Sequence, residues 1–365
     1  MSTVASRRLD ALLDAAEASG SCLVAHEERD RRALRRRLGT PGSDLISPVT
    51  GLYARREHWL QLRPDERALH VMRGLAERRP GIVFCAQSAA LAWGLPVSWH
   101  LLKETHVACQ RKSGLHSTPQ VVAHQISRDS PDVAGGLPVT SFWRTVFDCL
   151  ASLPFADALA IADAALARLF RSRKDMAALL RERFKGCPGI ARAVAICVWA
   201  EPIAESGGES IARANMICLG YAYPHLQLTL PDPMNSKRSF RIDFSWRGAG
   251  GRLIFGELDG DEKYTLTGRE PLDALLRERK REALLTVYHA SIARFSFAVA
   301  RSPARLAALL DLHGVPRGPA PELHDGVPVP PPGFADRPTI HGEGALILSD
   351  GTRVRFVEEL ACHAA

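Results

Sequence analysis

The chain has 365 residues, 46% of them hydrophobic, which is enough for two or three domains with cores of their own. No apolar run approaches the ~20 residues that span a bilayer, and the N-terminus lacks a signal-peptide pattern, so we expect a cytoplasmic protein without a membrane partner. The eight Cys form no C-x-x-C pair, which argues for reduced thiols and against a zinc site.

The charge of the chain is compatible with a polyanionic partner such as DNA. The net charge is +7 and the sequence pI is about 9.1. Most of the basic residues are Arg and Ala is abundant, which a GC-rich coding bias explains equally well. Basicity alone therefore does not identify the partner.

Residues 1–62 predict a winged-helix DNA-binding domain. Leu9 to Ala16 has leucines at helical spacing, and a second helix is expected over Glu27 to Leu38. Two short strands follow, at Leu45-Ile46 and at Gly51-Leu52-Tyr53-Ala54. Helices followed by a small hairpin are typical of a winged helix.

The second of these helices carries a dense run of Arg. We expect Arg32, Arg35 and Arg36 to contact DNA, mostly through its phosphates. The alternative is an ordinary solvated helix face, which is what such runs usually form.

Residues 63–200 predict an α+β, largely helical middle region. His106, His116 and His124 lack compact ligand spacing, so core or surface positions are favoured over a metal site. Arg144 and Asp148 are four residues apart on a predicted helix, where they can form an ion pair. No catalytic constellation is found in this region.

Several motifs of these two regions resemble the N-terminal region of the AbiEi-type antitoxins of type IV toxin–antitoxin systems. They are Gly51-Leu52-Tyr53-Ala54, Trp59, Gln87-Ser88-Ala89-Ala90-Leu91-Ala92-Trp93-Gly94-Leu95-Pro96, Gly136-Leu137-Pro138-Val139-Thr140-Ser141, Arg144-Thr145-Val146-Phe147-Asp148 and Ala162-Asp163-Ala164-Ala165-Leu166. The resemblance implies a winged-helix, DNA-binding N-terminal domain and a toxin protein as partner. The chain departs from the family in one respect, because the helix before Gly-x-Tyr is dense in Arg. Sequence-specific readout of DNA by this helix therefore does not follow from the resemblance.

A hairpin is predicted around the turn Gly248 to Gly251. Before the turn, polar and apolar residues alternate from Ser239 to Trp246, as in a strand with one wet face. After the turn, Leu253 to Phe255 is continuously apolar, as in a buried central strand. Pairing of the two strands would bring Asp243 close to Glu257.

Converging carboxylates repel one another unless a cation lies between them. Asp243, Glu257 and Asp259 therefore predict a site for Mg²⁺ or Mn²⁺, which prefer hard oxygen ligands. Such a metal activates water and stabilises charge on a phosphoryl group. Lys263, just beyond the strand, would orient the water or contact the scissile phosphate. The alternative is a plain α/β domain whose strand ends carry solvated acids.

These residues resemble the PD-(D/E)xK nuclease superfamily, most closely the group related to very-short-patch-repair endonucleases. There, a helix with a Glu precedes a hairpin that carries Asp and then Glu-x-Lys. The resemblance implies Glu209, Asp243 and Glu257 as catalytic residues. Asp259 stands where the Lys would be, as in the Glu-x-Asp-Gly form of the very-short-patch-like group, and Lys263 would replace that Lys from a shifted position. Alternatively, Glu209 is only an acid in the first turn of a helix, where the dipole favours it.

Further basic residues are predicted to hold nucleic acid. Arg241 shares a strand face with Asp243, where it would hold a phosphate or pair with the acid. Arg277 and Lys280 lie on a helix expected over Arg269 to Tyr288, which faces nucleic acid in very-short-patch-like nucleases. Glu residues alternate with them, so a salt-bridged solvent face is the alternative.

The expected fold class is α/β, or α+β overall. An N-terminal winged helix and an α-rich middle precede a nuclease-like domain over residues 201–315, with a restriction-endonuclease-like mixed sheet flanked by helices. Residues 316–365 predict a Pro-rich linker followed by a β-hairpin around Asp350-Gly351.

Three functions are compatible with these residues, of which the third is a protein-interaction module that neutralises a partner toxin. The first is a DNA-binding protein with a PD-(D/E)xK-type, metal-dependent phosphodiester hydrolase domain, a magnesium-dependent endonuclease in a defence or toxin–antitoxin context. The second is a non-catalytic antitoxin-type transcriptional regulator, in which the nuclease-like domain is a scaffold or senses a ligand. The first two differ in their dependence on metal.

Overall fold

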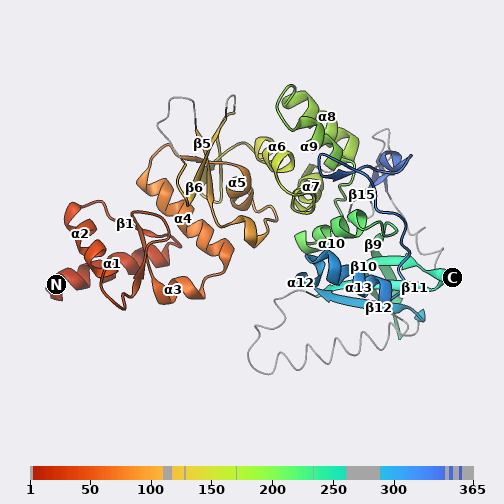
Figure 1. The fold of residues 1–365 in the computed structure, drawn as a ribbon, viewed down its shortest axis with the longest axis horizontal. Helices are drawn as coiled ribbons and strands as arrows, with labels where there is room; N and C mark the ends of the chain where they lie inside the picture. The colour runs from red at the N-terminus through yellow and green to blue at the C-terminus, as the bar shows by residue number, and fades with distance from the viewer. Residues whose placement is uncertain are drawn as a thin grey trace. The chain divides into compact units, whose positions relative to one another are not determined.

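The computed structural model describes residues 3–109, 117–126, 129–169, 171–232, 234–259, 288–341, 345–347 and 353–355. Two compact units divide the chain, Met1–Cys149 and Leu150–Ala365. Figure 1 shows the elements of both units, which are described separately below. The domain boundaries expected at residues 62 and 200 stay predictions. None of the helices in the described residues is both long and apolar enough to cross a membrane.

The first unit contains two sheets. Its helices are α1 (Thr3–Ala18), α2 (Glu28–Leu38), α3 (Arg56–Gln61), α4 (Pro64–Arg78), α5 (Ala86–Ala92), a 3-10 turn (Trp99–Leu101) and the start of α6 (Phe142–Ser152). The antiparallel strands β1 (Leu23–Val24), β3 (Leu52–Arg55) and β2 (Leu45–Ile46) lie side by side in that order. A mixed five-stranded sheet has the order β6 (Val121–Gln125), β5 (Thr105–Cys109), β4 (Val83–Phe84), β8 (Leu137–Val139) and β7 (Asp132–Ala134).

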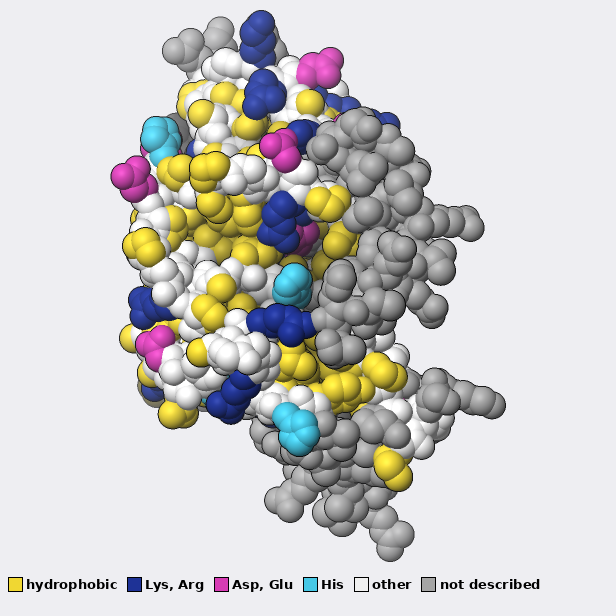
Figure 2. Space-filling view, turned by 90° about the vertical axis from the view of Figure 1, so that its right-hand side faces the viewer, with side chains coloured by type: hydrophobic (Ala, Val, Ile, Leu, Met, Phe, Trp, Pro, Cys, Tyr) yellow, Lys and Arg dark blue, Asp and Glu magenta, His cyan; other side chains and the backbone are white. Residues whose placement is uncertain are grey.

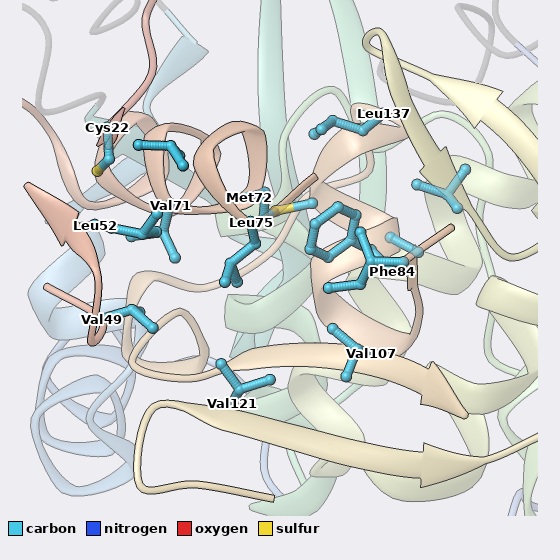
Figure 3. Close-up of a cluster of buried hydrophobic side chains, with 14 of the residues drawn as sticks. Cys22, Val49, Leu52, Val71, Met72, Leu75, Phe84, Val107, Val121 and Leu137 are labelled. Carbon is cyan, nitrogen blue, oxygen red and sulfur yellow. The ribbon is translucent and has the colours of Figure 1, made fainter. Parts of the chain in front are cut away.

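One hydrophobic core lies under both sheets of this unit. Met72 and Leu75 of α4 pack with Leu52 of β3 and Phe84 of β4, and all four side chains are buried (Figure 3). Gly74 allows this close approach, because a Cβ atom there would lie 3.1 Å from Leu52 Cδ2. Burial of apolar surface of this kind is the main favourable contribution to folding.

The second unit combines helices with a four-stranded sheet. Its helices are α7 (Phe155–Leu169), α8 (Arg173–Arg183), α9 (Ile190–Cys197), α10 (Gly207–Cys218), α12 (Phe297–Ala300) and α13 (Pro303–Leu312), with 3-10 turns at Ala249–Gly251 and Phe334–Asp336. The sheet order is β12 (Ser291–Ser296), β11 (Leu253–Asp259), β10 (Asn235–Arg247) and β9 (His225–Asp232). The pairs β9/β10 and β10/β11 are antiparallel, whereas β11 and β12 are parallel. The chain is therefore of mixed α/β type, and the predicted hairpin of β10 and β11 is confirmed.

Helices α10, α12 and α13 share a core with one face of this sheet (Figure 1). Phe244 and Trp246 of β10 face this core and pack with Met216 of α10. Gly256 lies opposite Phe244, and a Cβ atom on it would come within 3.0 Å of the Trp246 ring. The glycine before Glu257 thus leaves room for the Trp246 ring.

Strands β9 and β10 each change the face of the sheet to which their even-numbered residues point, nearer the start of β9 and nearer the end of β10. Side chains of a regular strand alternate, so residues of even number stay on one face. Here Phe244 and Leu226 pack in the core with α10, whereas Ile242 and Leu228 pack in a second cluster around Phe255. The register is the same on both sides of the change, since Phe244 pairs with Leu226 and Ile242 with Leu228. The change of face therefore falls on residues 243 and 227, which lie opposite each other.

The Pro- and Gly-rich stretch for which the sequence predicts a linker packs against helices of the second unit. Trp199 Nε1 donates to the carbonyl oxygen of Pro328 at 2.9 Å, and Phe334 is buried against the Trp199 ring. Short strands lie along this stretch and beyond it: β13 (Leu323–His324), β14 (Val327–Pro328), β15 (Thr339–His341), β16 (Ala345–Ile347) and β17 (Arg353–Arg355). Strands β16 and β17 pair antiparallel, on either side of Asp350-Gly351.

Candidate active site

The three predicted metal-ligating carboxylates line one cavity in the second unit. Asp243 comes from β10, and Glu257 and Asp259 come from β11. The cavity has a volume of about 380 Å³, and its remaining lining residues are Glu205, Ser239, Phe240, Arg241 and Leu258. Four of the eight lining residues are therefore acidic and one is basic.

The carboxylate of Asp243 is fixed to the neighbouring strand. Its Oδ2 accepts a hydrogen bond from the backbone N–H of Leu258 at 2.9 Å. The ordinary antiparallel register ends one pair earlier, at Phe244 and Gly256. The hydrogen bond holds Asp243 next to Glu257 at the point where the regular pairing stops.

Glu257 has a basic partner that the sequence did not single out. Arg294 Nη2 lies 2.8 Å from Glu257 Oε2, and the Glu257 side chain is only 6% exposed. Strand β12 runs parallel to β11 and places Arg294 directly opposite Glu257. The available signal was that Arg294 is the only charged residue in the strand Ser291 to Ser296.

Glu209 lies in the first turn of α10 and caps this helix. The Ser206 hydroxyl accepts from the Glu209 N–H at 3.2 Å and donates to Glu209 Oε1 at 2.8 Å. The Glu205 N–H donates to Glu209 Oε2 at 3.0 Å, and Gln227 Nε2 donates to the same oxygen at 2.8 Å. Glu209 is therefore a capping residue of the kind expected at a helix N-terminus. It is not among the residues that line the cavity.

Glu209 is nevertheless electrostatically coupled to the site. Burial raises the pKa of its carboxyl above the ordinary value, and the negative charge of Asp243 raises this pKa further. The hydrogen bonds donated by the Glu205 N–H and the Ser206 hydroxyl act in the opposite direction. The carboxylates of Glu209 and Asp243 therefore repel each other.

The predicted basic residues of this site have different positions. Arg241 lines the cavity beside Asp243, but its guanidinium is paired with Glu205. Lys263, Arg277 and Lys280 lie outside the described residues. Their predicted contacts with water, phosphate and nucleic acid therefore stay predictions.

The donor set of the cavity suits a hard divalent cation. Asp243, Glu257 and Asp259 supply its carboxylate oxygens. Oxygen ligands of this kind are those that Mg²⁺ and Mn²⁺ prefer. Within the described residues, no three His, Cys, Asp or Glu side chains are already close enough together to hold a metal ion. The residue types fit a metal, and binding would require their side chains to move closer together.

The basic helix α2 of the first unit divides its Arg residues between two roles. Arg37 is fixed by Asp10 at 2.7 Å and by Asp44 at 2.5 Å, so it holds the fold together. Arg32 pairs with Glu28 at 3.1 Å on the surface. Arg35 and Arg36 are exposed. The sequence grouped Arg32 with these two because spacing alone does not show which Arg has a carboxylate nearby.

Two of the three histidines for which the sequence favoured core or surface positions lie together in the first unit. His106 Nδ1 is 2.7 Å from His124 Nε2, and His106 Nε2 is 2.7 Å from the Gln87 side-chain amide. Burial, reinforced by the charge of His124, lowers the pKa of His106 to about 4. His106 is therefore neutral near pH 7. His116 lies outside the described residues.

The surface in Figure 2 bears on where nucleic acid would bind. On this face, Lys and Arg side chains lie singly or in small groups between apolar and neutral ones, with no continuous basic patch among the side chains that the structure describes. No family model, no curated protein and no solved structure matches this chain. The evidence for its function therefore comes from the site itself.

Proposed function

We propose that the protein binds DNA and that its second unit is a metal-dependent phosphodiester hydrolase of the PD-(D/E)xK, very-short-patch-repair-like type. The observation that carries this proposal is the single cavity lined by Asp243, Glu257 and Asp259. Strand–turn–strand geometry brings acids from two neighbouring strands together beside the N-terminus of a helix. Acids gathered in this way favour a divalent cation over water alone.

Each residue has a role in such a reaction. Asp243, Glu257 and Asp259 would hold Mg²⁺ or Mn²⁺, which would supply an activated water and stabilise the charge that develops on the phosphoryl oxygens. Arg241 would exchange Glu205 for a phosphate of the substrate, since guanidinium binds either oxyanion. Glu209 would hold the first turn of α10 in place through its hydrogen bonds with Glu205 and Ser206. Lys263 is assigned by the resemblance to the reacting phosphate.

The first unit would supply the contact to DNA. Helices α1 and α2 with the antiparallel strands β1, β3 and β2 support a winged-helix-like arrangement. Exposed Arg35 and Arg36 would contact phosphates, which position a protein on DNA without reading its sequence. The AbiEi-like motifs of this unit suggest a defence or toxin–antitoxin context, with a toxin protein as partner.

A second candidate function is favoured by Arg294. The ion pair between Arg294 and Glu257 occupies a carboxylate that a metal would need, and Asp259 stands where the catalytic Lys of related nucleases is found. A non-catalytic antitoxin-type regulator, with the second unit as a scaffold, would retain both features.

Cleavage of plasmid DNA with Mn²⁺ or Mg²⁺ separates the two functions. We expect the wild type to nick or cut DNA only with metal, and Asp243→Asn to lose cleavage while still shifting DNA in a gel. Asp325→Asn is the matched control, because Asp325 is exposed and lies outside the cavity. Metal-independent cleavage, or equal cleavage by Asp243→Asn, would refute a hydrolase. DNA binding without cleavage under all conditions would leave the regulator as the function.

A further inference from the structure

Two imidazole nitrogens of the first unit are buried and have no hydrogen-bond partner among the described residues. They are the Nε2 atoms of His58 on α3 and of His70 on α4. The two rings are neighbours, with their centroids 5.7 Å apart and their planes inclined at 53°. Buried polar atoms are normally paired, so two exceptions in adjacent rings need a common explanation.

The other ring nitrogen of His70 fixes the tautomer of this side chain. His70 Nδ1 lies 2.7 Å from the backbone carbonyl oxygen of Glu66, which can only accept a hydrogen bond. In the neutral ring Nδ1 therefore carries the hydrogen, and Nε2 keeps its lone pair. A histidine that binds a metal almost always donates its second ring N–H in this way, which orients the ring toward the ion. His70 is 6% exposed, so its position is fixed by the protein around it.

The separation of the two rings is compatible with one ion bound to both. A bond from a metal to an imidazole nitrogen is about 2.0–2.1 Å long. Since Nε2 lies roughly 1 Å from the centre of its ring, a metal bound by two such atoms would hold the centroids no more than about 6 Å apart. The observed 5.7 Å lies within this limit.

We infer that His58 and His70 form a site for a divalent transition-metal ion of the Zn²⁺ and Cu²⁺ class. Imidazole nitrogen suits these ions, whereas Mg²⁺ and Mn²⁺ prefer oxygen. The described residues add no third His, Cys, Asp or Glu to the pair, so water completes the coordination. The inference concerns the first unit alone and does not rest on the proposed function.

Such an ion would join two consecutive helices. Helix α3 ends at Gln61 and α4 begins at Pro64, so only two residues connect them. An ion that binds the folded chain and not the unfolded chain raises the thermal midpoint as its concentration increases. We therefore expect Zn²⁺ to raise the midpoint of the first unit's transition.

Two variants of the full chain each remove one of the nitrogens. His70→Asn lacks Nε2 but keeps an amide N–H near the place of Nδ1, where it can still donate to the Glu66 carbonyl. His58→Ala removes a side chain that is only half-buried. Competition with a chromogenic chelator measures the Kd for Zn²⁺. We expect both variants to bind more than about tenfold more weakly than the wild type, because a lost ligand costs more than a lost group behind a ligand.

His26→Gln is the matched control in the same unit, since His26 Nε2 already has a partner, Glu77, at 2.7 Å. It should leave the Kd for Zn²⁺ unchanged. Excess Mn²⁺ should not displace Zn²⁺ from the wild type, because the site offers nitrogen and no carboxylate.

EPR of the protein with one equivalent of Cu²⁺ adds a readout that a structural role would not move. Coupling to the ion counts the nitrogen ligands, and we expect two in the wild type and in His26→Gln. His58→Ala and His70→Asn should each lose one of them.

The possible results decide the inference clearly. Zn²⁺ binding that is weakened in His58→Ala and His70→Asn, but not in His26→Gln, supports it. No Zn²⁺ binding by the wild type, or equal binding by all four proteins, overturns it. If His70→Asn does not fold, His58→Ala decides alone, and a wild-type Kd in that variant overturns the inference.

Discussion

Two groups of acids in the second unit show how differently the same side chain can be used. Asp163 of α7 is 2% exposed and is surrounded by donors: Arg213 at 2.6 Å, the Ser210 hydroxyl at 2.5 Å and the N–H of Glu201 at 2.7 Å. Arg213 is completely buried and also donates to the Tyr223 hydroxyl. Each charge in this group is matched inside the protein.

The cavity between β10 and β11 is instead lined mainly by acids. Asp243, Glu257, Asp259 and Glu205 line it, and Arg241 is the only basic residue among the lining residues of the described chain. A closed, neutral group such as Asp163 with Arg213 joins elements together, whereas a group of acids open to a cavity is suited to recruit a cation.

The largest effect is expected from breaking the closed group. Asp163→Ala leaves the guanidinium of Arg213 buried without its carboxylate, which should destabilise the fold by roughly 3–5 kcal/mol. Urea-induced unfolding of the protein, followed through the transition of the second unit, measures this loss. The double variant Asp163→Leu with Arg213→Met removes both charges and should recover much of it. A loss below about 1 kcal/mol in Asp163→Ala would show that the pair is not structural.

The histidine pair of the first unit sharpens the comparison, because in the described part of the chain the ring nitrogens of His106 contact only His124 and the side-chain amide of Gln87. Burial lowers the folded-state pKa of His106 to about 4, against an ordinary value of 6.5. The folded state therefore binds fewer protons than the unfolded state between these values, and stability that is complete above pH 6.5 is lost as the pH falls. We expect a loss of about 2 kcal/mol between about pH 8 and about pH 5.

Denaturant titrations at a series of pH values measure this dependence. His106→Gln keeps a polar, neutral side chain and should flatten the profile, whereas replacement of the exposed His100 by Gln should leave it unchanged. A wild-type profile that is flat over this range would contradict a buried, neutral His106.

The exposed and paired Arg residues of α2 offer a third contrast. Replacing Arg35 and Arg36 by Gln should reduce the slope of log affinity for DNA against log salt by about 2, since two phosphate contacts are lost. Arg32→Gln is the control, because Arg32 already pairs with Glu28. Filter binding at several salt concentrations gives the slopes. Equal slopes in all three proteins would place the DNA contact elsewhere.

The smallest effect on stability is expected from a substitution in the acidic cavity between β10 and β11. Asp243→Asn keeps an oxygen that accepts from the Leu258 N–H and removes a charge that raises the pKa of Glu209. The thermal midpoint should therefore stay within about 1 °C or rise, since a ΔΔG of 1 kcal/mol corresponds to about 2–4 °C in a unit of this size. A large drop in the midpoint would indicate that Asp243 is structural, like Asp163.

The sequence predicted the parts of this site that depend on local pattern. Alternation before Gly248 and the apolar run after it were sufficient for the hairpin, and the hairpin brings Asp243, Glu257 and Asp259 to one cavity. The parts that depend on distant contacts were not predicted. Arg294 pairs with Glu257 through a parallel strand 37 residues later in the chain, and no local spacing reveals such a pair.

Gln227 and the C-terminal stretch show the same limit. Gln227 has a positive φ angle within β9, and no local pattern in the sequence indicates it. Residues 313–337 have the Pro and Gly content of a linker, yet Trp199 and Phe334 provide burial that composition does not report. Tertiary contacts decide both cases.

Calorimetric titration with Mn²⁺ tests the central claim most directly, with wild type, Asp243→Ala, Glu257→Ala and the surface control Asp325→Asn compared under the same conditions. We predict a binding isotherm for the wild type and for Asp325→Asn, and none for the two cavity variants, because the lost carboxylates are ligands. No binding by the wild type, with or without a DNA oligonucleotide, or equal binding by all four proteins, would contradict a metal site between β10 and β11.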